Sequence, residues 1–122
     1  MSKLIKMTEQ QGASFLATET GPKFEALEHQ GWNGATIEES GVFVFMFDIE
    51  KDAVEFPLHA SDQVWMGYVV SGSGTLYAGC ANEEKTGQVH YQAGDFISFA
   101  ANTLHGWEND CQPSKLMFIR QA

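Results

Sequence analysis

The sequence predicts an all-β domain of antiparallel strands, and three observations carry this prediction. From residue 34 onward, short apolar segments of strand length alternate with turns rich in Gly, Asn and Asp. No strand–helix alternation supports a parallel α/β fold. The chain has 122 residues, 43% of them hydrophobic, which suits one domain with a core of its own. A barrel or sandwich is therefore expected.

The N-terminal part is the least patterned region. We expect residues 1–34 to form an extension that packs on the barrel or on a partner, and residues 35–122 to form the barrel. Residues 23–29 (KFEALEH) have an amphipathic pattern that fits a helical turn or two, confined by Gly21-Pro22 and Gly31. His29 is expected at the surface.

The segment 42–49 (VFVFMFDI) predicts a strand that is apolar on both faces. Alternation divides its residues between an inner face of Phe43, Phe45 and Phe47 and an outer face of Val42, Val44 and Met46. The Phe face is expected to line the barrel interior. The outer face calls for a cover, and a second subunit is the natural one, so a homodimer is expected.

Further strands are predicted along the rest of the chain. Pro57 in VEFPLHAS suits an edge strand or a strand start. The segments VWMGYVV and TLYAGC flank SGSG, which is interpreted as a hairpin turn. QVHYQ, FISFAA and KLMFIR complete the set. His90 lies in QVHYQ, where an exposed or carbonyl-bonded histidine is the commoner outcome.

Two histidine-bearing segments, HASDQVWMGYVVSGSG and GDFISFAANTLHGWEN, resemble the two signature segments of the cupin superfamily. In the first, His59 and Gly72 match the pattern's first His and closing Gly. In the second, Gly94, His105 and Asn109 fall in register. The resemblance covers roughly Phe43 to Arg120 and implies a double-stranded β-helix, the cupin jelly-roll barrel. Because this fold hosts many activities, the resemblance alone assigns none.

Departures from the family pattern affect its metal site. That site, with three His and one Glu, holds a divalent Fe, Mn, Ni or Zn ion. Ser61 stands in place of its second His and Trp65 in place of its Glu, which leaves His59 and His105. Gln63 shares strand parity with His59, so a His59–His105–Gln63 set with water is chemically reasonable. A metal-free cavity is the favoured interpretation, and no cofactor is assigned with certainty. A milder departure is Asn102 in place of Gly, since Asn tolerates positive φ.

The candidate ligand pocket combines the residues at and beside these positions, and no catalytic residue is assigned. Trp65 either fills the cavity or stacks on a ligand, and Trp107 either lines the mouth or lies on the outer face. Tyr68 has the opposite strand parity and is expected outside. The pocket residues proposed from the sequence are His59, Ser61, Gln63, Trp65, His105 and Trp107.

Three functional hypotheses follow. The first is a small-molecule-binding cupin barrel with a degenerate metal site, acting as a binder or sensor. The second is a metal-dependent cupin enzyme, a dioxygenase, isomerase or lyase, acting on a small organic substrate. The third is a non-catalytic structural or interaction barrel filled by aromatic side chains.

The charge of the chain limits the classes of partner that we expect, and its N-terminal segment and cysteines bear on the expected location. Sixteen acidic against seven basic residues give a formal charge of −9, which disfavours nucleic acid and anionic membranes as partners. The N-terminal segment MSKLIKMTEQQG has no apolar h-region, so a cytoplasmic location is expected. Cys80 and Cys111 are expected to be reduced thiols.

Overall fold

The computed structural model describes residues 4–9, 13–18, 22–80 and 84–122. In this part of the chain every regular element is a β-strand, which confirms the predicted all-β class. None of the described residues forms a helix with the length and hydropathy needed to cross a membrane. Neither Cys80 nor Cys111 forms a disulfide within the described residues.

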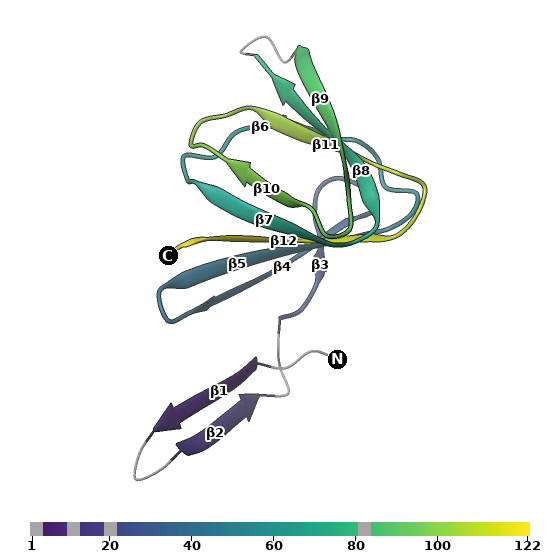
Figure 1. Ribbon diagram of the computed structural model, residues 1–122. Coiled ribbons are helices and arrows are strands. Elements are labelled where there is room, and N and C mark those ends of the chain that lie inside the picture. Colours follow the sequence, from purple (N-terminus) through teal and green to yellow (C-terminus); the bar gives the residue numbers. More distant parts are fainter. Residues whose placement is uncertain (1–3, 10–12, 19–21, 81–83) are drawn as a thin grey trace.

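Two antiparallel sheets form the barrel, and a separate hairpin lies outside it (Figure 1). The first sheet contains, in spatial order, β10 (Phe96–Phe99), β7 (Trp65–Ser71), β12 (Ser114–Gln121), β5 (Val42–Ile49), β4 (Trp32–Glu39) and β3 (Glu25–Ala26). The second contains β6 (Phe56–His59), β11 (His105–Asn109), β8 (Ser73–Gly79) and β9 (Lys85–Gln92). The hairpin consists of β1 (Leu4–Glu9) and β2 (Ala13–Thr18), which pair with each other.

From β5 onward the chain crosses repeatedly between the two sheets, and this connectivity makes the barrel a jelly roll. Strands β5, β7, β10 and β12 lie in the six-stranded sheet, and β6, β8, β9 and β11 lie in the other. Pro57 lies in β6, an edge strand, as its missing N–H predicts. Asn102 has a φ of 61°, the left-handed conformation expected for it.

The SGSG segment is a crossover between the sheets, and its interpretation as a hairpin turn was wrong. It joins β7 to β8, which belong to different sheets. Gly72 has a φ of 83°, and a Cβ there would lie 2.0 Å from the Ser114 hydroxyl oxygen. The tight turn therefore requires glycine, but the pairing of its flanking strands is decided by distant segments.

Residues 23–29 contain no helix; instead Glu25–Ala26 forms β3, which pairs with β4. The segment is confined between Pro22 and Gly31, and Gly31 has a φ of 89°. It is too short for its helical hydrogen bonds to offset the free-energy cost of helix nucleation. The proposed domain boundary at residues 34/35 falls inside β4, because that strand already begins at Trp32.

The core occupies one end of the barrel. Trp32, Ile49 and Val69 are fully buried, and Leu116 is nearly so. The Trp32 indole N–H donates to the Val54 carbonyl at 2.6 Å, which satisfies the polar atom of a buried ring. Register places Trp32 opposite Ile49 and Leu116 opposite Val69, so these side chains form one packed layer across β4, β5, β12 and β7.

Candidate ligand cavity

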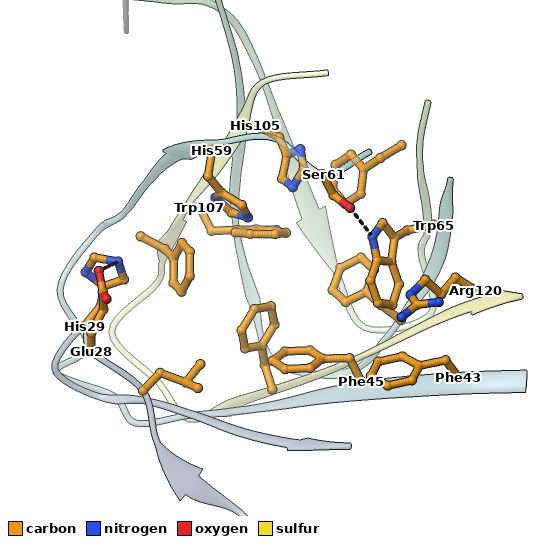
Figure 2. A pocket seen from close by; sticks show the side chains of 15 residues that line it. Glu28, His29, Phe43, Phe45, His59, Ser61, Trp65, His105, Trp107 and Arg120 are labelled. Carbon is orange, nitrogen blue, oxygen red and sulfur yellow. Dashed lines mark hydrogen bonds and ion pairs between the residues drawn. The ribbon is translucent and has the colours of Figure 1, made fainter. Parts of the chain in front are cut away.

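A cavity of about 670 Å³ opens between the sheets, beyond this packed layer (Figure 2). Most of its surface is apolar and aromatic. The described residues that line it are Leu27, Glu28, His29, Phe43, Phe45, Phe47, Phe56, His59, Ser61, Trp65, Phe99, His105, Trp107, Phe118 and Arg120. The inner face predicted for segment 42–49 is thereby confirmed, because Phe43, Phe45 and Phe47 are among them.

His59 ends strand β6 and turns its ring toward the cavity (Figure 2). Its Nδ1–H donates to the Pro57 carbonyl at 3.0 Å. Because a carbonyl only accepts, this bond fixes the proton on Nδ1 and leaves the Nε2 lone pair available. The backbone of the edge strand thus orients the imidazole.

His105 begins β11 and is held in the same way, with its Nδ1–H donating to the Thr103 carbonyl at 2.8 Å. It pairs with His59 across the strands, and their ring centroids lie 4.4 Å apart. The His105 ring stacks on Phe99, with centroids 3.9 Å apart and planes 12° apart. Burial, with a smaller contribution from His59, lowers the pKa of His105 to about 4. His105 is therefore neutral at pH 7.

Ser61 and Trp65, which replace two metal ligands of the cupin pattern, form a hydrogen-bonded pair. The Trp65 indole N–H donates to the Ser61 hydroxyl oxygen at 3.2 Å, and the backbone N–H of Gln63 donates to the same oxygen at 3.1 Å. Both lone pairs of that oxygen are then used, so the Ser61 O–H remains available as a donor. Trp65 lines the cavity and does not fill it.

Of the other residues predicted for the pocket, Trp107 lines the cavity and Gln63 does not. Trp107 lies inside and is 2% exposed. Gln63 is exposed, and its amide N–H donates to the Asp62 carboxylate at 3.3 Å. The parity argument for Gln63 fails because residues 62–63 form a bend, so the alternation of β6 does not continue through them.

The lining residues that the sequence did not predict for the cavity are Leu27, Glu28, His29, Phe56, Phe99, Phe118 and Arg120. His29, expected at the surface, packs edge-on against Phe56 with centroids 4.6 Å apart. Arg120 places its guanidinium carbon 4.2 Å from the Phe43 ring centroid and 5.4 Å from that of Trp65. A signal for Arg120 exists in the sequence, because it continues the inward alternation of Leu116 and Phe118 along the last strand.

The donor set does not fit the metal site of the cupin pattern. Two imidazoles with available Nε2 atoms are present, and backbone anchoring of Nδ1 is the usual support of a ligating histidine. The other two positions carry Ser61, whose oxygen already accepts two hydrogen bonds, and Trp65, which has no ligand atom. Within the described residues no three His, Cys, Asp or Glu side chains gather as metal ligands would.

Comparison with known proteins agrees with the jelly-roll architecture. A family model described as "Cupin domain" matches residues 45–120, more than half of the chain. The chain belongs to the cupin family. No curated protein sequence matches this cupin.

Solved structures similar to this cupin are distant in sequence and share its fold. KdgF from Halomonas sp. has a TM-score of 0.66 at 14% identity, with 81% of this chain and 86% of KdgF covered. Oxalate decarboxylase from Lactobacillus farciminis, solved as a formate complex, has a TM-score of 0.67 at 14% identity, with 82% of this chain covered. The cupin spans only 30% of that enzyme's chain. Bacillus subtilis oxalate decarboxylase, described with Mn(II) centres, gives a TM-score of 0.67 at 10% identity; 82% of this chain and 27% of the enzyme's are covered.

Proposed function

We propose that this cupin binds a small organic molecule inside its barrel, as a binder or sensor, through contacts that need no metal. The observation that carries the proposal is an aromatic cavity of about 670 Å³ with two imidazoles oriented at one wall by hydrogen bonds from Nδ1 to backbone carbonyls. Apolar clefts of this size with a few oriented polar groups are typical ligand sites. The volume also argues against the hypothesis of a barrel filled by its own aromatic side chains.

The lining favours a ligand that carries a ring. Edge-to-face and stacked arrangements already connect the lining rings, as between Phe43 and Trp65 at 6.0 Å. A flat ligand would extend this set of contacts. The Nε2 atoms of His59 and His105 would accept hydrogen bonds from its hydroxyl or amine groups, because both Nδ1 atoms hold the protons.

The proposal includes a homodimer formed through the outer face of the six-stranded sheet. Cross-strand neighbours on this face are apolar: Phe96 lies opposite Tyr68, and Met66 lies opposite Ile119. Phe96 is 73% exposed and Met66 59% exposed in the single chain. Such a continuous apolar face requires a cover, and a second copy supplies a matching one. A monomer mass in light scattering would exclude this assembly.

Elemental analysis after incubation with Fe, Mn, Ni and Zn, together with a thermal-shift screen of small aromatic compounds, tests the proposal. We expect far less than one metal equivalent per chain and a rise in Tm with ring-containing compounds. His59→Ala and His105→Ala should reduce the rise, whereas His90→Ala, an exposed histidine bound to Asp110, should not. One metal equivalent, lost in the first two variants, would instead support a metal-dependent enzyme.

A further inference from the structure

Arg120 is a cation inside an aromatic cavity and has no anionic partner among the described residues. The chain has sixteen Asp and Glu residues and seven Lys and Arg residues, and Arg120 is its only arginine. Exposed Lys85, in contrast, forms an ion pair with Glu55. In so acidic a protein, the lack of a carboxylate beside a half-buried guanidinium needs a specific explanation.

The hydrogen-bonding capacity of Arg120 is also largely unused. Its Nε atom is buried and has no hydrogen-bond partner in the described part of the chain, and one terminal nitrogen donates to the Gln121 carbonyl at 2.9 Å. The rings of Phe43 and Trp65 hold the guanidinium plane by cation–π contact. A guanidinium fixed in this way retains donors arranged to match a carboxylate.

Ser61 adds a donor on the same side of the cavity. Its oxygen accepts from the Trp65 indole, and Figure 2 shows Ser61, Trp65 and Arg120 in succession along one wall. Both lone pairs of that oxygen are taken, so its O–H remains to donate, and none of the described residues accepts a hydrogen bond from it. Ser61 and Trp65 stand at two positions that carry metal ligands in the cupin pattern. Together with Arg120 they form a wall of hydrogen-bond donors, the donor wall.

From this arrangement we infer that the ligand is an arylcarboxylate, with its carboxylate on Arg120 and the Ser61 hydroxyl and its ring among the cavity aromatics. This inference rests on the proposed binding function and gives the ligand its chemical class. The imidazoles of His59 and His105 lie on the other sheet, in β6 and β11, whereas Arg120 lies in β12, so the guanidinium and the imidazoles occupy different walls. A carboxylate is thereby oriented toward a single cation.

Isothermal calorimetry with phenylacetate and phenylacetamide tests the inference, since the two probes match in shape and differ in charge. We expect the protein to bind phenylacetate about 10- to 100-fold more tightly, the range for hydrogen bonds to a charged group. Arg120→Gln should abolish that preference and leave the affinity for phenylacetamide within about twofold. Acetate, which lacks the ring, should bind at least about tenfold more weakly than phenylacetate.

Two further variants keep the result interpretable. Arg120→Lys retains the charge without the planar fork and should keep part of the preference. Lys115→Gln removes the same charge from an exposed position of β12 and should change neither affinity. Equal affinity of the protein for both probes, or a preference that survives Arg120→Gln, would overturn the anion subsite and leave the binding function standing. Failure to bind either probe would overturn both.

Discussion

Along β5, the inward-facing side chains change from fully buried at one end of the barrel to half-buried at the other. Ile49 is 0% exposed and Phe47 5%, whereas Phe45 and Phe43 are only half-buried. The partners change with them, because Ile49 lies opposite Ser114 and Phe43 lies opposite Arg120. One strand with one alternation therefore builds a packed core and an open cavity.

The difference between the two ends comes from what the other strands contribute. At the packed end, Trp32, Val69 and Leu116 close the space around Ile49. At the open end the strands contribute polar atoms. The Nε atom of Arg120 has no hydrogen-bond partner among the described residues, and Trp65 donates to the Ser61 hydroxyl oxygen. Core packing therefore stabilises one half of the barrel and leaves the other half free to be specialised for a ligand.

The largest expected effect separates the two ends through Phe47 and Phe43. Phe47→Ala removes a ring that contacts Trp32, Phe56 and Trp107 and should lower the free energy of unfolding by about 3–5 kcal/mol. Phe43→Ala, on the same strand face, should cost only about 1–2 kcal/mol and weaken ligand binding instead. Urea unfolding measures both. Equal losses would show that the Phe43 end is packed as tightly as the core.

The pH dependence of stability provides a second contrast, because His105 belongs to the cavity wall yet is 5% exposed. Its folded-state pKa is lowered to about 4 by burial, below the unfolded value of 6.5. Between pH 4 and pH 6.5 the unfolded chain binds more protons than the folded chain. The contribution of neutral, buried His105 to the free energy of unfolding is therefore complete above pH 6.5 and is lost as the pH falls toward 4. The expected loss is about 3 kcal/mol.

Urea unfolding at pH 7 and pH 4, compared between the unmodified protein and His105→Gln, isolates this contribution. The variant should lose less stability on acidification, because a glutamine does not titrate. Asp110 does not confuse the comparison, since hydrogen bonds from Ser73 and His90 lower its pKa below 3.8 and place its titration at more acidic pH. Parallel losses in the two proteins would show that His105 is protonated without penalty.

Local patterns in the sequence were enough to predict most of the barrel. Alternation fixed the inner face of residues 42–49, and Pro57 indicated an edge strand. The two histidines were brought together by family resemblance, and the structure places them opposite each other in β6 and β11. No local pattern in either segment would have paired them, because 45 residues lie between His59 and His105 in the chain.

What the sequence did not yield depends on long-range register. SGSG has the composition of a hairpin turn, and only the pairing of β7 with β12 and of β8 with β11 makes it a crossover. Arg120 becomes a cavity residue because β12 lies between β5 and β7, which brings Phe43 and Trp65 to its guanidinium. The alternation of Leu116 and Phe118 predicts which face of β12 carries Arg120, but only the neighbouring strands make that face the cavity wall.

Gln63→Ala should have the smallest effect and sharpens the comparison where sequence and structure disagree. Strand parity made Gln63 a candidate metal ligand. The bend at residues 62–63 instead leaves its side-chain amide exposed, with one N–H donating to the Asp62 carboxylate. Truncating an exposed side chain changes the free energy of unfolding by less than about 0.5 kcal/mol, and metal content and phenylacetate affinity should also be unchanged. Its backbone N–H, which donates to Ser61, survives the substitution. If Gln63→Ala weakened binding while Asp62→Ala did not, the amide would have to turn into the cavity when ligand is bound, and the donor wall would extend beyond Ser61, Trp65 and Arg120.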